Sequence, residues 1–164
     1  MSERAWIRGA QRGSVDDLER LFREHWPRAY RAALLVTGDA AAAEDIAQEA
    51  FLAAVRNLDR FDRRRPFAPW LHRIVVNRAI DWTRSRKLRA EVELGDYLPA
   101  PAAVEPDGTF GRIADLAPEH RAVVVLRYVL EYTPGEIAEL LDLPRGTVNS
   151  RLRRGLDRMR EQEA

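Results

Sequence analysis

The chain of 164 residues contains no cysteine, and this absence removes two classes of protein. Without thiols there is neither a disulfide framework nor a thiolate metal site, and a reducing compartment is permitted. No window approaches the roughly 18 apolar residues of a membrane-spanning helix, and the first residues lack the apolar core of a secretory signal. We therefore expect a cytoplasmic protein that does not insert into a membrane.

Residues suited to catalysis are also sparse. His25, His72 and His120 lie far apart in the sequence, no glycine-rich phosphate loop occurs, and no His, Asp and Glu cluster has metal-ligand spacing. We therefore predict no enzymatic activity, no cofactor and no metal site.

Positive and negative charges are almost equal in number, but they are concentrated in different segments of the chain. The net charge of +1 argues against a protein that coats nucleic acid through bulk electrostatics. Residues 56–89 and 145–160 are rich in arginine, whereas residues 91–119 are mostly acidic. Two basic segments separated by an acidic one suggest two contacts with one polyanion.

Apolar residues recur at three- and four-residue steps, which predicts an all-α fold. We expect helices over residues 15–36, 40–58 and 67–87, with Pro27 bending or interrupting the first and Val55 on the inner face of the second. The period is lost over residues 88–108, where three prolines remove backbone donors, and it resumes afterwards. The chain is therefore predicted to form two small helical domains, residues 1–87 and 109–164, joined by a flexible acidic linker, residues 88–108.

The strongest local pattern is a helix-turn-helix over residues 133–160. Thr133 is expected to cap its first helix, and Pro134 to occupy the first turn. Ala138 is small enough for the two helices to cross closely. A very short break at residues 142–144 precedes a second helix with a polar and basic outer face.

That second helix has the composition of one that enters the major groove. Arginine can bond guanine, and asparagine can bond adenine, each pair contributing about 1–3 kcal/mol of discrimination. The alternative is an ordinary helical hairpin with a solvated face, but the cap, the small residue, the short turn and the basic face favour a DNA reader. The predicted reading residues are Arg145, Thr147, Asn149, Ser150, Arg151, Arg153 and Arg154.

Residues 45–87 read DIAQEAFLAAVRNLDRFDRRRPFAPWLHRIVVNRAIDWTRSRK. This segment resembles region 2 of the extracytoplasmic-function (ECF, group 4) sigma factors of the sigma-70 family. The helix-turn-helix resembles region 4 of the same family. The resemblance implies a factor that binds core RNA polymerase and directs promoter recognition and transcription initiation. It implies that Asp45, Gln48 and Glu49 dock on the beta-prime clamp helices, that region 4 meets the beta flap and the minus-35 element, and that an anti-sigma factor regulates the chain. No long extension precedes the first predicted helix, so we do not expect self-inhibition by such an extension.

The resemblance further implies that the loop at residues 60–66 captures an unstacked base of the minus-10 element. An extruded base needs an aromatic wall, a polar group for its edge and cations for the adjoining phosphates. Phe61 could supply the wall or pack in the core, and core packing is preferred for Trp70. Asn77 is the candidate for the base edge, and the candidates for phosphate contacts are Arg63, Arg64, Arg65, Arg73 and Arg78.

A stand-alone helix-turn-helix regulator that binds DNA as a dimer is the alternative function. Such a regulator would need only the carboxyl-terminal domain. This alternative therefore gives no role to the first domain. Such a regulator should bind duplex DNA specifically without polymerase, whereas a sigma factor should do so only weakly.

Overall fold

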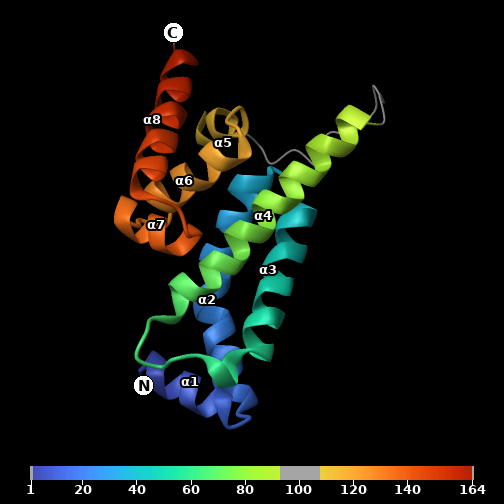
Figure 1. Cartoon of the computed structure of the whole chain (residues 1–164). Coiled ribbons are helices and arrows are strands. Elements are labelled where there is room, and N and C mark those ends of the chain that lie inside the picture. Colours follow the sequence, from blue (N-terminus) through green and yellow to red (C-terminus); the bar gives the residue numbers. More distant parts are fainter. Residues whose placement is uncertain (1, 93–107, 164) are drawn as a thin grey trace.

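The computed structural model describes residues 2–92 and 108–163, and within them every regular element is helical. The second, third and fourth helices form an elongated bundle, α1 lies across one end of it, and the last four helices pack against its side (Figure 1). The elements are α1 (Glu3–Gln11), α2 (Val15–Thr37), α3 (Ala40–Arg56), a 3-10 turn (Leu58–Arg60), α4 (Phe67–Val92), α5 (Gly108–Ala114), α6 (Pro118–Tyr128), α7 (Pro134–Leu141) and α8 (Arg145–Glu161). The all-α prediction is confirmed.

The long helices agree with the predicted ones in number and order, with differences at particular residues. Pro27 lies inside α2 and does not interrupt it. Leu21 and Ala29, on either side of this proline, are both buried, and their packing offsets the backbone hydrogen bond that the prolyl ring removes. Gly38 ends α2 in the left-handed conformation with φ of 68°, which glycine adopts without steric cost.

The last long helix, α4, continues to Val92, so the predicted linker begins too early. Residues 88–92 contain neither proline nor glycine, and nothing in the backbone stops the helix at Lys87. The remainder of the predicted linker, residues 93–107, lies outside the described residues.

The first helix, α1, was not predicted. It anchors the amino terminus through Ile7, which is only 1% exposed. The side chain of Gln11 donates hydrogen bonds to the carbonyl oxygens of Leu58 and Phe61, at 2.9 and 3.3 Å. This short helix therefore holds the segment that leads into the predicted base-capturing loop.

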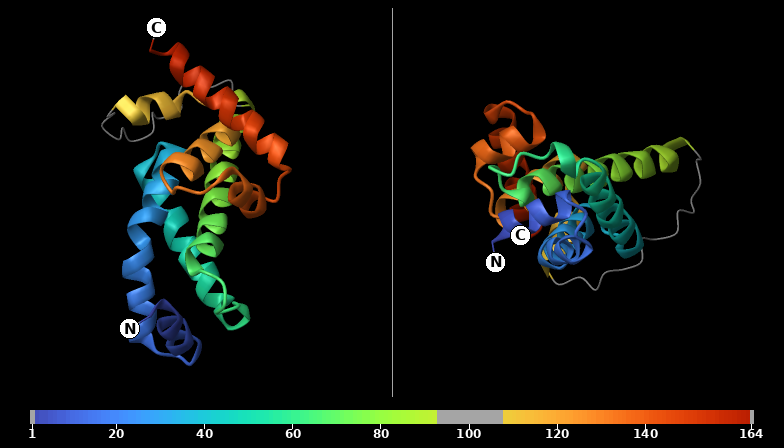
Figure 2. Two further views of the ribbon diagram at one scale, coloured as in Figure 1. Left: turned by 90° about the vertical axis from the view of Figure 1, so that its left-hand side faces the viewer. Right: turned by 90° about the horizontal axis from the view of Figure 1, so that it is seen from below.

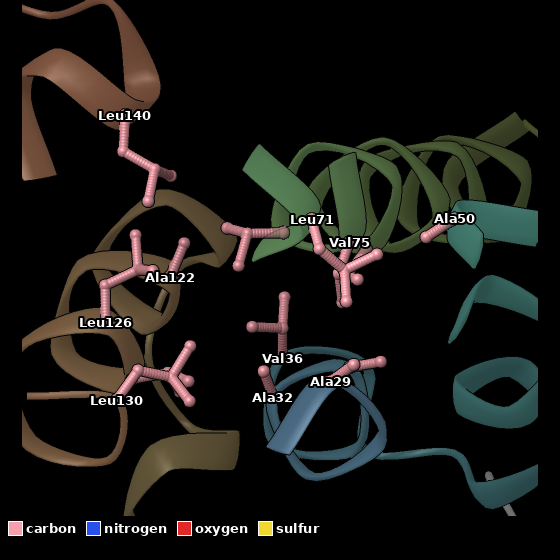
Figure 3. Close-up of a cluster of buried hydrophobic side chains, with 14 of the residues drawn as sticks. Ala29, Ala32, Val36, Ala50, Leu71, Val75, Ala122, Leu126, Leu130 and Leu140 are labelled. Carbon is pink, nitrogen blue, oxygen red and sulfur yellow. The ribbon is translucent and has the colours of Figure 1, made fainter. Parts of the chain in front are cut away.

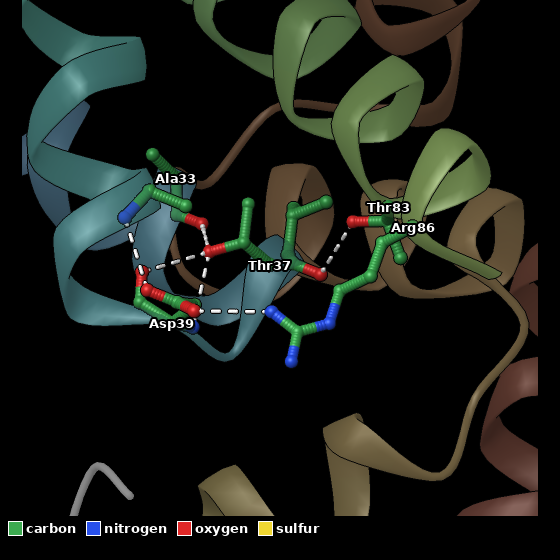
Figure 4. A network of polar contacts seen from close by, with 7 residues as sticks. Ala33, Thr37, Asp39, Thr83 and Arg86 are labelled. Carbon is green, nitrogen blue, oxygen red and sulfur yellow. Dashed lines mark hydrogen bonds and ion pairs between the residues drawn. The ribbon is translucent and has the colours of Figure 1, made fainter. Parts of the chain in front are cut away.

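A polar network fixes the turn between α2 and α3 to the carboxyl-terminal half of α4 (Figure 4). The Thr37 hydroxyl donates to the Ala33 carbonyl at 2.8 Å, and the Asp39 carboxylate caps α3. Arg86 of α4 reaches the same carboxylate at 3.2 Å and lies over the ring of Trp82. One arginine of the basic segment therefore has a structural partner.

The carboxyl-terminal bundle is built around the predicted helix-turn-helix. Thr133 and Glu136 form a capping box, in which each side chain accepts from the other residue's backbone N–H at 3.2 and 3.0 Å. Asp142 ends α7 in the left-handed conformation. Gly155 allows α8 to approach α6 closely, because a Cβ atom there would lie 2.9 Å from Cγ2 of Val124. The predicted cap and turn are confirmed.

The two bundles share one continuous hydrophobic core. Figure 2 shows the two bundles from two further sides, with α6 packed against α2 and α4 and α7 packed against α4. Val36 and Leu71 of the first bundle meet Leu126, Leu130 and Leu140 of the second, and all five side chains are buried (Figure 3). The sequence predicted a core for each half but not this contact between them.

Polar contacts also join the two bundles along this seam, the boundary between α2 and α4 on one side and α6 and α7 on the other. The Arg121 guanidinium donates to the Val36 carbonyl at 2.5 Å and also to the carbonyls of Ala114 and Leu116. The Arg28 side chain donates to the Leu130 carbonyl at 3.2 Å. A hydrogen bond of 2.6 Å joins Nδ1 of His72 to the hydroxyl of Tyr132.

Candidate nucleic-acid and polymerase interfaces

The predicted reading residues lie on α8, whose inner face is closed by Val148, Leu152 and Gly155. The structure separates them into two rows. One row, Arg145, Asn149 and Arg153, is exposed to solvent. The other row consists of Thr147, Ser150, Arg151 and Arg154, which line a cavity.

This second row faces the amino-terminal bundle. The cavity, of about 550 Å³, is completed by Arg84 of α4 and by Glu119 of α6. Arg84 Nε donates to the Glu119 carboxylate at 2.6 Å. Although its partial burial alone would raise the pKa of Glu119, a backbone hydrogen bond and the charges of Arg84 and Arg151 hold that pKa below its usual value.

The predicted base-capturing loop has a defined turn. The Asp62 carboxylate accepts hydrogen bonds from the Arg64 backbone N–H at 3.0 Å and from its guanidinium at 3.0 and 3.1 Å. These hydrogen bonds, with the charge of Arg64, lower the pKa of Asp62. Arg64 therefore forms an ion pair within the loop, with Asp62. The exposed Arg63 and Arg65 have no ion pair among the described residues.

Next to this loop lies an aromatic wall. The rings of Phe61 and Trp70 are stacked with their centroids 4.7 Å apart, and Phe67 meets both of them edge-on. Phe67 is buried, but Phe61 and Trp70 are only half-buried and line a cavity of about 1100 Å³. Trp70 thus combines core packing with a place in the cavity wall, which the sequence had not indicated. A space of this size is ample for one nucleotide.

The three predicted residues of α4 differ in their surroundings. Arg73 is exposed and lines the same cavity as Phe61. Asn77 is exposed one turn further along and is not among the residues that line it. Arg78 forms an ion pair of 3.0 Å with Glu49 of α3, so a predicted DNA contact and a predicted polymerase contact are partners in this structure.

The predicted polymerase contacts form an exposed stripe along α3. Asp45, Gln48 and Glu49 lie on it, and the exposed Leu52 and Val55 continue it by one and two turns. Val55 is 39% exposed, so its predicted inward position is wrong. Phe51, Ala54 and Leu58 already fill the inner face of this segment. The apolar stripe of a helix is wide, so the sequence pattern does not distinguish a residue at the edge of the stripe from one at its centre.

Two tests for other chemistry concern the described residues alone. Within residues 2–92 and 108–163, no group of three or more His, Cys, Asp or Glu side chains could hold a metal ion. No helix in the described part of the chain is both long enough and apolar enough to cross a membrane.

Comparisons with known proteins find the same family for both bundles. Residues 21–89 match the family model of Sigma-70 region 2, and residues 112–161 match that of Sigma-70, region 4. The ECF RNA polymerase sigma factor SigW of Bacillus subtilis is 33% identical over 95% of this chain and 94% of its own length. SigL of Mycobacterium tuberculosis, also an ECF RNA polymerase sigma factor, is 34% identical over 90% and 89%.

Solved structures share the fold across both bundles. CnrH, solved in complex with the cytosolic domain of CnrY, matches with a TM-score of 0.74 and 25% identity over 98% of this chain and 96% of that one. The sigma factor RpoE of Bartonella quintana, solved with the anti-sigma factor NepR, matches with a TM-score of 0.71 and 21% identity over 90% and 96%.

Proposed function

The chain belongs to the extracytoplasmic-function sigma factors of the sigma-70 family, and on that premise we propose how its two bundles divide the work. As a sigma factor it binds RNA polymerase and directs promoter recognition, and phosphodiester chemistry remains with the polymerase. We assign residues 1–87 to polymerase binding and to the minus-10 element, and residues 109–164 to the minus-35 element. The connection between them begins after Val92, where α4 ends.

The observation that carries this division is the pairing of two unlike DNA surfaces on one chain. The first bundle offers an aromatic cavity beside exposed arginines, which suits an unstacked base and its phosphates. The second offers a capped helix-turn-helix, which suits duplex DNA. A stand-alone regulator would need only the second.

At the minus-10 element, Phe61 and Trp70 together form the wall for the captured base. Arg63, Arg65 and Arg73 contact its phosphates, and Arg64 shapes the loop through Asp62 while remaining at its surface. Asn77 contacts a base edge further along the strand. Arg78 reaches the backbone once its pair with Glu49 opens. Each phosphate contact should therefore contribute to the salt dependence of promoter binding.

At the minus-35 element, α8 enters the major groove. The exposed row of Arg145, Asn149 and Arg153 reaches the groove directly, and the second row, which includes Thr147 and Ser150, lines the cavity beside the first bundle. Arg151 and Arg154 of the second row meet bases or phosphates after α8 moves away from Arg84.

For the polymerase we propose that the α3 stripe docks on the beta-prime clamp helices and that the second bundle contacts the beta flap. Asp45, Gln48 and Glu49 supply the polar and acidic contacts, and Leu52 and Val55 supply apolar area at the end of the stripe. Burying these two exposed apolar side chains against the polymerase would add hydrophobic free energy to the polar contacts.

An anti-sigma factor is the expected regulator, because a sigma factor of the same fold has been solved with the anti-sigma factor NepR. The working place of the chain is the cytoplasm, where promoter DNA and RNA polymerase are found.

The test of this function begins with a random promoter library. The chain is mixed with core polymerase, and the start regions of the transcripts are sequenced. We expect enrichment of a two-part element with fixed spacing, and transcripts without any enriched element would contradict the assignment.

The division of labour is tested with the double variant Arg151→Ala and Arg154→Ala. It should weaken the use of the upstream element and leave core binding unchanged. Arg158→Ala is the matched control, because Arg158 lies on the same helix but pairs with Glu161. Loss of core binding in the double variant would show that α8 serves the polymerase instead.

A further inference from the structure

The first helix, α1, lies at the same end of the first bundle as the loop at residues 60–66 (Figures 1 and 2). None of the residues found to line the cavity beside the aromatic wall belongs to α1. The helix nevertheless reaches the wall in two separate ways, one through the backbone and one through side chains. It can therefore influence the wall without being part of the cavity lining.

The backbone contact is made by Gln11, at the carboxyl-terminal end of α1. Its side-chain amide donates to the carbonyl oxygens of Leu58 and Phe61, at 2.9 and 3.3 Å. The Phe61 carbonyl belongs to the peptide group that joins Phe61 to Asp62, and the Asp62 carboxylate shapes the loop through Arg64. Gln11 therefore fixes the backbone at Phe61, the residue that the wall and the loop share.

The side-chain contact runs through a buried histidine. Nε2 of His25, on α2, is hydrogen-bonded to the Glu3 carboxylate at 2.5 Å. The centroid of the His25 ring lies 5.0 Å from that of Phe67. Phe67 in turn meets Phe61 and Trp70 edge-on. Because His25 and Phe67 are both buried in a closely packed interior, Glu3 helps to fix the ring that supports the wall from inside.

The helix that makes both contacts is itself fixed on α2. Ile7 is buried, and a Cβ atom at Gly9 would lie 1.7 Å from a carboxylate oxygen of Asp17, so the two helices approach closely there. The Ser2 side chain caps the start of α1 by accepting from the Ala5 N–H at 3.3 Å. Both contacts to the wall therefore start from an anchored element.

We propose that α1 positions the aromatic wall for strand capture, with Gln11 and Glu3 as the positioning residues. The inference rests on the proposed assignment of Phe61 and Trp70 to the captured base. A wall that is already held in its stacking orientation loses less conformational freedom when the base arrives, so more of the stacking energy remains as affinity. A chain without these contacts should still bind the melted strand but should gain little from the captured base.

The test compares oligonucleotides that differ by one base. Holoenzyme, the complex of core polymerase with this chain, is titrated with a fluorescent single-stranded minus-10 oligonucleotide selected from the promoter library, and with versions that are abasic at one position each. The captured base is the one whose removal weakens binding in the original chain but far less in Phe61→Ala. We expect its removal to weaken binding by the original chain about tenfold, or about 1.4 kcal/mol, as for one stacked base.

Gln11→Met removes the amide donor without changing the charge, and it should reduce this penalty to about threefold or less. Its affinity for the abasic oligonucleotide should equal that of the original chain. A general loss of folding would instead weaken the binding of both oligonucleotides equally. Val15→Ala is the control, because Val15 is exposed in the first turn of α2 close to the end of α1, and it should keep the tenfold penalty.

Glu3→Met and Glu3→Gln form a matched pair that removes the same charge. Glutamine can still accept a hydrogen bond from His25 and methionine cannot, so only Glu3→Met should show the reduced penalty. An unchanged tenfold penalty in Gln11→Met or in Glu3→Met would overturn the proposal. A reduced penalty in Glu3→Gln as well would assign the effect to the lost charge and would contradict positioning through His25.

The positioning role and the proposed function fail in different ways. If the effect of no abasic position depends on Phe61, the assignment of the wall to a captured base is wrong, and the positioning role falls with it. If such a position exists but the variants of α1 leave its penalty unchanged, the positioning role is wrong and the proposed function stands.

Discussion

Mild acid should destabilise this protein through one buried histidine. His72 is 1% exposed, its Nδ1 is bonded to the Tyr132 hydroxyl, and its Nε2 has no partner among the described residues. Burial, with the nearby charges of Arg28 and His25, lowers the pKa of His72 to about 4. Burial also raises the pKa of Tyr132 to about 12, so its hydroxyl stays protonated and can donate to the neutral ring.

The magnitude follows from the difference between the folded and unfolded states. An unfolded histidine has a pKa of 6.5. Between pH 6.5 and 4, His72 is therefore protonated in the unfolded chain but neutral in the folded chain. Its contribution to stability is complete above pH 6.5 and is lost as the pH falls. The free energy of unfolding should be about 2 kcal/mol lower at pH 5 than at pH 7.5, and the loss should approach about 3.4 kcal/mol below pH 4.

The assay is urea unfolding, followed by circular dichroism, at several pH values from 5 to 7.5. His72→Asn is the comparison variant, because its amide can still bond Tyr132 but does not titrate. Subtracting its profile removes whatever part of the pH dependence does not come from His72. If the original chain and the variant lose equal stability between pH 7.5 and 5, the reasoning about a neutral buried His72 is refuted.

The remaining predictions concern local packing and are measured on the full chain. Thr133→Ala removes the capping box and should lower the free energy of unfolding by about 1 kcal/mol, and an unchanged urea midpoint would contradict this. Gly155→Ala forces a methyl group against Val124 and should cost about 1 kcal/mol or more, whereas Gly111→Ala in α5, with open space around it, should be neutral or stabilising by up to about 1 kcal/mol. Equal effects of the two glycine variants would refute the close approach of α8 and α6. Gln11→Ala should speed amide hydrogen exchange near residues 58–61, and unchanged exchange there would show that α1 does not hold the loop.

The long helices could be predicted because each buries a stripe of apolar residues that recurs with the helical period. The first helix escaped notice because Ile7 is its one buried residue and arginines surround it. The seam between the bundles escaped for a different reason. Leu71 and Val36 face the second bundle, but in the sequence they are indistinguishable from residues that pack within the first. Periodicity reveals which residues are buried and not which element covers them.

The candidate site divides in the same way. The exposure of Asn149 and Arg153 on α8 follows from helical geometry and was predictable, whereas the place of Ser150, Arg151 and Arg154 in a cavity completed by Arg84 was not. The pairing of Arg78 with Glu49, and of Arg84 with Glu119, joins residues 29 and 35 positions apart and depends on how α4 packs. The place of Glu136 and Glu139 in the lining of the cavity beside Phe61 and Trp70 was equally hidden, because that lining exists only when the two bundles meet.

The most direct test of the central claim is a footprint of the reconstituted complex on a selected promoter. Core polymerase with this chain should protect the upstream element from hydroxyl radicals and should make thymines of the minus-10 element reactive to permanganate. The chain alone should do neither. Protection of duplex DNA by the chain alone, or failure of the chain to associate with core polymerase, would contradict the account.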